Sequence, residues 1–564
     1  MERTNRILIW TVLLWCMGCG RAGAPRSDID DGIAEHAMVV TAHPLATEVG
    51  VAVLREGGNA VDAAVAVHYA LAVVLPWAGN IGGGGFMVVR TANGKVITLD
   101  FRETAPMRAS RDMFLDSAGV ANPRLSQFGH LAVGVPGSVA GLQAAHDSLG
   151  SLPMARLIQP AIDLAAMGFG LTAREAQRLN EALVGLRTHS TRPNAFTTKS
   201  HWRAGDSIRL PELAVTLGRV RDSGPAGFYF GRTADLIVAE MERGGGAITK
   251  ADLAAYTPVW RAPVHGRYRD LDIHGMAPPS SGGIILLQLL AAMETVDVRT
   301  MGWQRASTVH RMVEAERRAY ADRAAHMGDA DHVRVPVVGL LDPVYMRERM
   351  QDIDEQEATP SAAIGAGVPD EQEETTHFSI VDAQGNAVAC TTTLNGSYGA
   401  HVVVGGAGFL LNNEMDDFST APGAPNAYGL VGGEANAIAP GKRMLSSMTP
   451  TIVTHHGDLV MVLGTPGGST IPTSVFQVLL NVVDHDMTMQ EAVSAPRFHH
   501  QWLPDVIQEE AGAITSTDSA TLVRMGHGLV VREPIGRVDA IRVLPDGRLQ
   551  GGADPRGDDS IGGY

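Results

Sequence analysis

The pattern of hydrophobic and polar residues changes character about two thirds of the way along the chain. Before Thr375 most hydrophobic residues recur at helical spacing, whereas after it they alternate with polar residues as in strands. Residues 38–78 are rich in alanine and valine at helical spacing, with a break at Gly57-Gly58. This pattern predicts two helices, and the second, over residues 60–75, carries so few charges that we expect it to be buried.

The remainder of the first half is mostly helical by pattern, with a few strands. Four glycines, Gly82 to Gly85, precede a predicted strand at 86–89, which favours a tight turn or close backbone approach over a phosphate-binding loop. Ser280 or Ser281 is expected to cap a helix over residues 284–293. Further strands are predicted at 96–102 and, as a pair, at 264–273. Further helices are predicted at 138–149, 154–167, 172–183, 233–243 and 307–327.

The last third of the chain, from Thr375 on, starts with a hairpin. Residues 375–381 alternate, residues 382–386 form a turn, and residues 387–394 return as a strand. Residues 353–374, which precede it, are acidic and lack a strong apolar period, so they read as a linker that can be cut without breaking a core. The order of elements indicates a layered α+β architecture. Other strands are predicted at 402–404, 409–411, 450–454, 459–464, 529–532 and 539–543, and helices at 470–484 and 489–495.

Composition limits the class of protein. The chain has 564 residues, of which 45% are hydrophobic and 19% charged, which is typical of a globular protein of several domains or of one large unit with a cleft. Its net charge of −16 argues against nucleic acid as the main partner, because a phosphate-binding surface needs a basic patch. Three cysteines are too few for a disulfide framework.

The first residues have the features of an export signal. Arg3 and Arg6 precede an apolar stretch over residues 7–15, and small residues around Cys19 follow. We therefore expect residues 1–24 to be a signal peptide and the protein to be exported, either periplasmic or lipid-anchored at the cell envelope through Cys19. An uncleaved anchor helix is the alternative, and we expect no other contact with a membrane.

A candidate nucleophile stands at the border between the linker and the hairpin. If the chain were cut before Thr375, its hydroxyl and a new α-amino group would belong to the same residue, which combines nucleophile and base. The pair His499 and His500 could bind a metal, but the sequence supplies no suitably spaced third ligand, so we expect packing roles and neither a metal nor a cofactor.

Several motifs together resemble one family, the γ-glutamyltransferases (glutathione hydrolases) of the N-terminal-nucleophile hydrolase superfamily. The resemblance runs from about residue 37 to residue 564. It implies a four-layer αββα sandwich and a precursor that is cut between Glu374 and Thr375. The products would be a large subunit, 25–374, and a small catalytic subunit, 375–564, which form a heterodimer. The motifs are Asp100 to Glu103, Pro278 to Gly283, Thr375 to His377, Leu411 to Ser419, Leu445 to Met448, Pro466 to Ser469 and Ala495 to Trp502.

The resemblance also implies roles for individual residues. Thr375 would be the nucleophile, with its own α-amine as base and with Thr393 hydrogen-bonded to it. Backbone N–H groups of Gly467 and Gly468 would form the oxyanion hole. Tyr428 would belong to a lid over residues 422–433.

Two further sets would bind the charged end of a γ-glutamyl substrate. An α-carboxylate calls for a guanidinium and hydroxyl donors, and an α-ammonium calls for acceptors. Position 414 is Glu where some bacterial relatives have Gln, and either side chain accepts from an ammonium. The carboxylate set is Arg102, Ser446 and Ser447, and the ammonium set is Asn395, Glu414 and Asp417.

The implied activity is hydrolysis of glutathione and other γ-glutamyl amides, and transfer of the γ-glutamyl group to amino acids or dipeptides through a threonine ester. The partners would therefore be small molecules, with no nucleic acid among them. The sequence does not rank hydrolysis against transfer. Two alternatives remain: an acylase of the same fold that removes glutaryl side chains from cephalosporin-type compounds, and a non-catalytic, surface-anchored binding protein.

Overall fold

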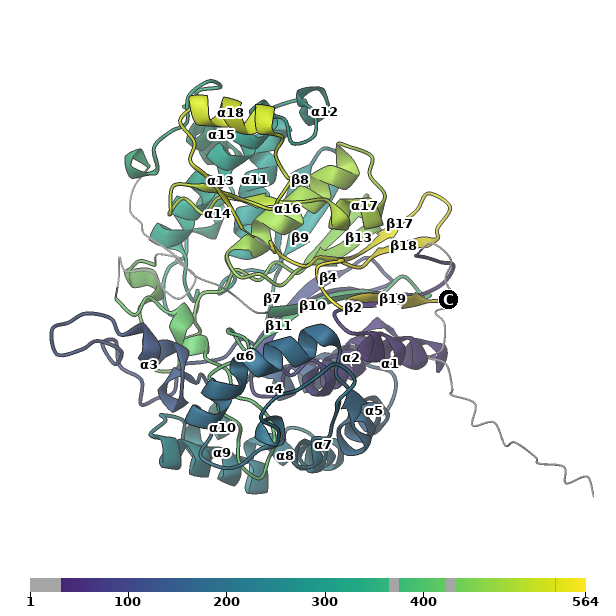
Figure 1. Ribbon diagram of the computed structural model, residues 1–564. Helices are drawn as coiled ribbons and strands as arrows, with labels where there is room; N and C mark the ends of the chain where they lie inside the picture. Colours follow the sequence, from purple (N-terminus) through teal and green to yellow (C-terminus); the bar gives the residue numbers. More distant parts are fainter. Residues whose placement is uncertain (1–31, 365–374, 422–431, 533) are drawn as a thin grey trace, which may run out of the picture.

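Two stacked β-sheets with helices on both outer sides form the centre of the computed structural model (Figure 1). It describes residues 32–364, 375–421, 432–532 and 534–564. The first seven-stranded sheet runs β1 (Ile33–Ala34), β18 (Leu549–Gly552), β17 (Asp539–Val543), β13 (Asp458–Gly464), β12 (Thr451–His455), β9 (Leu271–Gly275), β8 (Val264–Tyr268). The second runs β19 (Ser560–Gly563), β2 (Met38–Thr41), β10 (Thr375–Val381), β11 (Ala387–Thr393), β3 (Gly84–Arg90), β4 (Val96–Asp100), β7 (Val259–Arg261). The predicted αββα sandwich is confirmed.

Helices cover the two outer faces. The second sheet is covered by α1 (Pro44–Arg55), α2 (Ala60–Val74), α4 (Ser138–Leu149) and α5 (Met154–Met167), with α5 packed on α2. The first sheet is covered by α11 (Gly282–Glu294), α16 (Thr470–Val483) and α17 (Met489–Ser494), with α13 (Ala306–His326) packed on α11.

Further helices and two small sheets complete the chain. The other helices are α3 (Pro123–Gln127), α6 (Ala173–His189), α7 (Pro211–Ser223), α8 (Ala226–Tyr229), α9 (Gly231–Gly244), α10 (Lys250–Ala255), α12 (Val298–Met301), α14 (Val337–Leu340), α15 (Pro343–Met350) and α18 (Ser516–Arg524). Two small sheets are formed by β5 (Phe169–Gly170) with β6 (Ser207–Ile208), and by β14 (Phe498–His499), β15 (Ile507–Glu509) and β16 (Leu529–Val531).

The helix α2 shows why the sequence folds this way. All its residues are buried, as its near-absence of charge predicts. Its start is fixed by a capping box, in which the Asn59 side chain accepts from the N–H groups of Val61 and Asp62 while the Asp62 carboxylate accepts from the Asn59 N–H. The helix can therefore serve as a hydrophobic support beneath β10 and β11.

Strand β10 separates two environments by its alternation. Phe378 and Ile380 point into the hydrophobic core shared with α2, whereas Val381 belongs to the small core between the two sheets. Because successive side chains of a strand point to opposite faces, the side chains of Thr375 and His377 lie on the same face of β10 as Val381, the face that packs against the first sheet. Gly464 of β13 leaves room there, since a Cβ at that position would lie 2.3 Å from the His377 ring.

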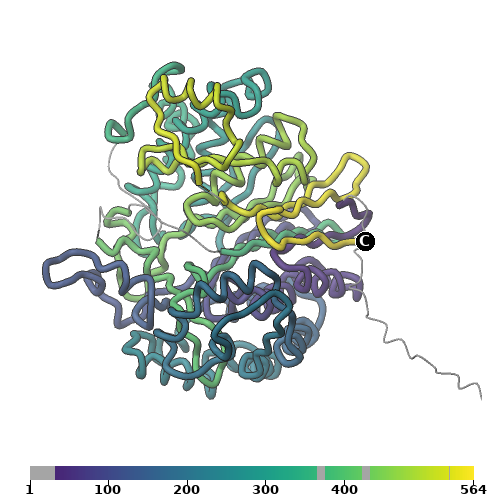
Figure 2. The backbone as a smooth tube through the Cα atoms, viewed as in Figure 1, coloured from purple at the N-terminus to yellow at the C-terminus, as the bar shows by residue number. Residues whose placement is uncertain are grey.

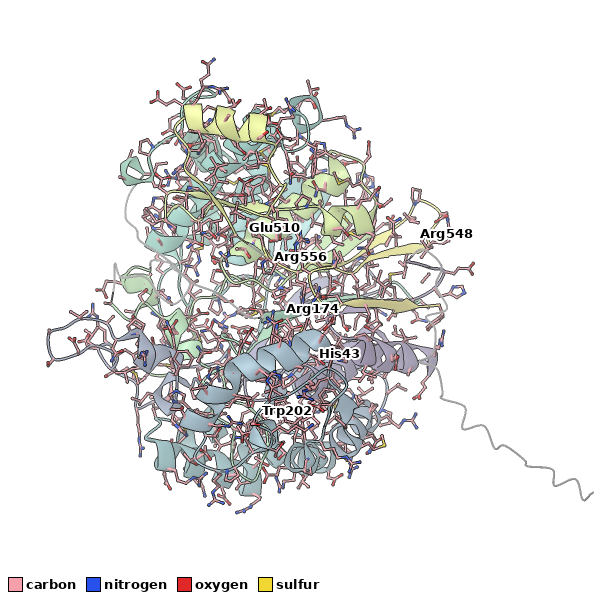
Figure 3. All side chains as sticks on the ribbon, viewed as in Figure 1. His43, Arg174, Trp202, Glu510, Arg548 and Arg556 are labelled. Atoms are coloured by element: carbon pink, nitrogen blue, oxygen red, sulfur yellow. The ribbon has the colours of Figure 1, made fainter. Side chains whose placement is uncertain are left out.

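The described part of the chain begins and ends in the same region. Figure 2 shows the purple start and the yellow end of the tube side by side, and β2 pairs with β19 while β1 pairs with β18. The connection from β18 in the first sheet to β19 in the second contains Arg556, which Figure 3 labels together with Glu510. Its guanidinium donates to Glu510 at 2.6 Å and to Asp554 at 2.9 Å. The C-terminal strand is thereby fixed two strands away from Thr375.

Two local predictions are wrong, and a third, on the start of α11, is correct only for one of its two residues. Residues 38–41 were included in a helical pattern, but they form β2, a fully buried strand whose apolar residues face a core on both sides. Residues 402–404 and 409–411 are joined by an isolated bridge, Val403 to Leu410, rather than by regular strands. Ser281 precedes α11, but its hydroxyl donates to the Ser446 carbonyl at 2.7 Å instead of capping the helix. The hydroxyl of Ser280, the other predicted residue, accepts from the Gly282 N–H at the first position of α11, at 3.1 Å.

Among the described residues the structure contains no helix with the length and apolar character needed to cross a membrane. The predicted signal peptide over residues 1–24, including Cys19, lies outside the described residues.

Buried Glu316 on α13 provides a stability prediction. Burial raises its pKa well above the ordinary value of 4.5, and its carboxyl accepts from the His500 N–H at 2.8 Å. The folded state therefore holds a proton that the unfolded chain releases above pH 4.5, so this group costs stability increasingly as pH rises. We expect Glu316→Gln to raise the free energy of unfolding by about 1–2 kcal/mol at pH 8.

Calorimetric melting of the variant and the parent at pH 4 and pH 8 checks this. The gain in melting temperature should appear at pH 8 and vanish at pH 4, where the carboxyl is protonated in both states. Equal melting temperatures at pH 8 would contradict the assignment of a neutral Glu316.

Candidate active site

Thr375 and Thr393 lie opposite each other at one end of the β10–β11 hairpin. Their Cα atoms are paired in the antiparallel register, and both side chains are buried. The Thr393 hydroxyl accepts from the Asn395 N–H at 2.7 Å. The two hydroxyl-bearing residues that the sequence predicted as partners are therefore neighbours across the hairpin.

The glycine run at the start of β3 makes this arrangement possible. A Cβ on Gly83 would lie 2.1 Å from the Thr393 carbonyl oxygen, and a Cβ on Gly85 would lie 2.4 Å from the Thr391 carbonyl oxygen. Asn80 ties the same region together, since its side-chain amide donates to the Thr393 carbonyl at 2.8 Å. The expectation of a close backbone approach at Gly82 to Gly85 is confirmed.

A cavity that is partly open to solvent lies in front of the two threonines. It brings together residues from both sides of the predicted cleavage point and most of the residues that the sequence singled out. Its lining is Arg102, Arg323, Thr375, Thr393, Asn395, Asp417, Ser446, Ser447, Met448, Gly468 and Ile471.

The predicted site residues outside this lining fall into two groups. Glu414 is fully buried behind Arg102, and Gly467 precedes the cavity-lining Gly468. Glu374 and the predicted lid residue Tyr428 lie outside the described residues.

Arg102 is fully buried and shared by three carboxylates. It lies 2.6 Å from Glu414 and 3.7 Å from Glu103, and it donates a hydrogen bond to Asp417. Burial alone would lower the pKa of Arg102, but these neighbours raise it above its usual value. The guanidinium predicted for a carboxylate and two of the acceptors predicted for an ammonium are thus paired with each other.

The surrounding carboxyls titrate abnormally. Burial raises the pKa of Glu103 to about 8, and it raises the pKa values of Glu414 and Asp417, while the charge of Arg102 opposes each rise. One guanidinium beside three buried carboxyls is balanced only if some of them hold a proton. A ligand with one cationic and one anionic group can replace such internal pairs without changing the total charge.

Two glycines shape the wall of the cavity before α16. Gly467 has φ 127° and Gly468 has φ 47°, a conformation that favours glycine. A Cβ on Gly467 would lie 2.5 Å from the Thr470 hydroxyl and 3.2 Å from Gly536. The turn thus brings backbone close to the cavity just ahead of a helix N-terminus, where N–H groups are available to an anion.

Sequence reasoning missed three residues of the lining, namely Arg323, Met448 and Ile471. Arg323 stands in the last turn of α13, on which three other arginines precede it, so the sequence pattern did not distinguish it. It donates to the hydroxyls of Ser281 and Ser447 at 3.0 and 3.3 Å.

The buried histidines have hydrogen-bonding partners. His499 contacts the Thr473 hydroxyl at 2.8 Å and the Gln501 side chain at 3.0 Å, and burial lowers its pKa to about 3. His500 lies 3.3 Å from Asp505, and burial lowers its pKa to about 4. Both have the packing role that was expected of them.

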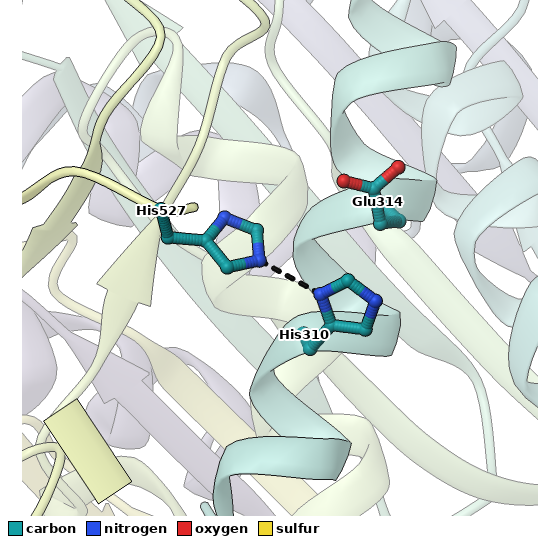
Figure 4. A group of neighbouring side chains, drawn as sticks. All are labelled: His310, Glu314 and His527. Carbon is teal, nitrogen blue, oxygen red and sulfur yellow. Dashed lines mark hydrogen bonds between the residues drawn. The ribbon is translucent and has the colours of Figure 1, made fainter. Parts of the chain in front are cut away.

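A second cluster joins α13 to the segment before the predicted cleavage point. Figure 4 shows the three side chains, His310, Glu314 and His527. The Nδ1 atom of His310 lies 2.7 Å from the Nε2 atom of His527, which is a hydrogen-bond distance. The other nitrogen of His310 contacts the Asp354 carbonyl at 2.7 Å, and Glu314 accepts from the Thr359 N–H at 3.0 Å. Glu314 is also paired with the guanidiniums of two arginines on its own helix, which disfavours a cation there. The cluster fixes residues 354–359 to α13.

Comparison with known proteins gives consistent results. A family model described as gamma-glutamyltranspeptidase matches residues 46–564. The glutathione hydrolase proenzyme of Escherichia coli (strain K12) is 46% identical over 545 residues, covering 94% of this chain and 92% of that protein.

Solved structures are also similar. A cephalosporin acylase from Bacillus halodurans superposes with a TM-score of 0.84 at 29% identity, covering 96% of this chain and 98% of that chain. A γ-glutamyltranspeptidase chain from Helicobacter pylori, 45% identical, gives a TM-score of 0.58 and covers 60% of this chain and 97% of that chain. The match over nearly the whole chain shows that this protein belongs to the γ-glutamyltranspeptidase family.

Proposed function

We propose that this chain is the precursor of a self-processing γ-glutamyltransferase. The enzyme hydrolyses glutathione and other γ-glutamyl amides and transfers the γ-glutamyl group to amino acids or peptides. One observation carries the proposal: buried Thr375, at the first position of β10, lines the same cavity as Arg102 and Asp417. A hydroxyl nucleophile thereby faces a site that suits a zwitterionic amino acid.

Processing would begin with the Thr375 hydroxyl. Its Oγ attacks the carbonyl carbon of Glu374, the C–N bond breaks, and the nitrogen takes up the proton of the hydroxyl to become the new α-amine. Water then hydrolyses the resulting ester, leaving a carboxylate on Glu374 and restoring the hydroxyl. The products are chains 25–374 and 375–564, which stay together as a heterodimer because β10 pairs with β2 of the larger chain.

Turnover would reuse the same group. The α-amine of Thr375, with a pKa of roughly 7.7–8.0, accepts the hydroxyl proton while Oγ attacks the γ-carbonyl of the donor. Backbone N–H groups of Gly467 and Gly468 stabilise the oxyanion, and Thr393 orients the nucleophile. The amine leaves with the proton, and water or an acceptor amine then attacks the γ-glutamyl ester.

The charged end of the donor would exchange partners with the site. Its α-carboxylate takes Arg102 and the hydroxyls of Ser446 and Ser447, and the acidic partners of Arg102 become available. Its α-ammonium takes those acceptors together with the Asn395 side chain. The pairs Arg102–Glu414 and Arg102–Asp417 support this, since they place a carboxylate-binding group and two ammonium-binding groups side by side.

The rival within the same fold is an acylase, which the structural similarity to a cephalosporin acylase favours. A glutaryl donor lacks the α-ammonium, so the acceptor set would be left unpaired. We expect the purified protein to release amine from a γ-glutamyl anilide at least about 10²-fold faster than from the matching glutaryl anilide. Comparable rates, or a preference for the glutaryl compound, would indicate the acylase.

Two further parts of the proposal rest on sequence. Tyr428 would cover the occupied cavity as part of a lid, and residues 1–24 would direct export to the periplasm or the cell envelope. Fractionation of producing cells tests the second point, because the processed protein should be recovered outside the cytoplasm. Adding a dipeptide acceptor to the anilide assay separates transfer from hydrolysis.

A further inference from the structure

Arg323 connects α13 to the wall of the cavity. It is 4% exposed and lines the cavity together with Ser446 and Ser447. Its Nε donates to the Ser281 hydroxyl at 3.0 Å, and its terminal nitrogen donates to the Ser447 hydroxyl at 3.3 Å. The side chain thus reaches both the loop before α11 and the tandem serines.

The chemistry of these contacts fixes the direction of the Ser447 hydroxyl. A guanidinium has only donors, so the Ser447 oxygen must be the acceptor, and its own hydrogen must be donated elsewhere. The Ser446 hydroxyl oxygen is likewise an acceptor, because it accepts from the Met448 N–H at 3.2 Å. Both serine hydrogens are therefore left for an acceptor such as a carboxylate oxygen.

Arg323 also acts on Ser446 through Ser281. The backbone N–H and the hydroxyl of Ser281 both donate to the Ser446 carbonyl, at 2.8 and 2.7 Å. Because the Ser281 oxygen accepts from Arg323, its hydroxyl hydrogen is committed to that carbonyl. This contact explains why Ser281 does not cap α11.

The charged residues that line the cavity favour the binding of an anion beside Ser446 and Ser447. Arg102 and Arg323 are cationic, and Asp417 is the acidic member of the lining. Arg323 adds a second positive charge on the side of the serines, where neutral hydroxyls alone would bind a carboxylate weakly.

We propose that Arg323 is a positioning residue that turns the Ser446 and Ser447 hydroxyls into donors for the α-carboxylate of the substrate, and so sets the preference for donors that carry this group. The inference rests on the proposed function, because it assumes a γ-glutamyl donor in the cavity.

A double-mutant cycle tests it. Arg323→Met should lower kcat/KM for a γ-glutamyl anilide by about 10- to 100-fold, mostly through KM, since binding of the carboxylate is lost. In a Ser447→Ala background the same change should cost at least about 3-fold less than in the parent, because one of the two hydroxyls that Arg323 orients is already absent. Losses that multiply in the double variant would overturn the proposal.

Two controls separate positioning from a general structural role. Arg311→Met removes another buried arginine of α13, one that donates to the Ala292 carbonyl and does not line the cavity, and should leave KM unchanged. Arg323→Lys keeps a donor-only cation and should recover part of the lost affinity. All variants are assayed as processed two-chain protein, so that failure to fold is recognised.

A second donor distinguishes this inference from the proposed function. A 4-aminobutyryl anilide keeps the ammonium and lacks the α-carboxylate, so Arg323→Met should affect its turnover, or its binding as a competitor, far less. An equal loss on both donors would overturn the role of Arg323 alone. Absence of γ-glutamyl turnover in the unmodified protein would instead overturn the proposed function.

Discussion

Replacing Thr375 with alanine is expected to leave the purified protein as one uncut chain that releases no amine from a γ-glutamyl anilide. The change removes the oxygen that attacks Glu374 during processing and the donor carbonyl during turnover. It removes little else, because the side chain is small and the strand keeps its backbone pairing with β11. Denaturing electrophoresis and the anilide assay on the same preparation check both parts.

Two neighbouring changes serve as controls for this result. Thr375→Ser keeps the hydroxyl and should still self-cleave and turn over. Thr376→Val alters the next residue, whose side chain points to the opposite face of β10, and should process normally. Residual cleavage in Thr375→Ala would place the nucleophile on another residue.

Replacing Arg102 with glutamine is expected to reduce kcat/KM for a γ-glutamyl anilide by about 10²- to 10⁴-fold. A buried guanidinium that binds a carboxylate contributes about 3–5 kcal/mol when one partner is removed, and each 1.36 kcal/mol corresponds to tenfold. The loss should fall on donors with an α-carboxylate, which steady-state kinetics with the γ-glutamyl and 4-aminobutyryl anilides measures.

The same variant should also lose stability in a pH-dependent manner. Without Arg102, the pKa values of Glu103, Glu414 and Asp417, already raised by burial, rise further. The folded state then binds more protons than the unfolded chain, so its stability falls as pH rises above the ordinary carboxyl range. The gap in melting temperature between parent and variant should widen from pH 4.5 to pH 8.

Arg443→Gln is the matched control for Arg102→Gln. Arg443 is also buried, lies 3.4 Å from Asp100, donates to the Thr257 carbonyl at 2.7 Å, and does not line the cavity. Its loss should lower the melting temperature without a selective effect on donors that carry the α-carboxylate. Equal kinetic losses in both variants would contradict a direct role of Arg102 in binding.

The strand and helix pattern could be predicted where one period dominates. Residues 375–381 alternate between polar and apolar from His377 to Ile380 and form β10 with the predicted bounds, and residues 138–149 form α4 as predicted. Residues 38–41 were assigned wrongly because a strand buried on both faces has no alternation. Residues 402–404 and 409–411 are apolar and β-like, yet tertiary packing leaves them as irregular backbone with an isolated bridge.

The site could be predicted only in part, for physical reasons. Thr375, Thr393 and Asn395 are close in sequence, so their meeting follows from the hairpin register. Arg102 and Asp417 were placed in separate sets, because ion pairing between distant segments depends on the fold. Arg323 gave no signal, since its position on the cavity is decided by how α13 packs and not by its local sequence.

The most direct test of the account is the intact mass of the purified protein under denaturing conditions, with sequencing of the smaller chain from its N-terminus. The account predicts two chains, of which the smaller begins at Thr375 with a free α-amine and ends at Tyr564. A single full-length chain, or a smaller chain that begins at any other residue, would contradict the claim that Thr375 becomes an N-terminal nucleophile.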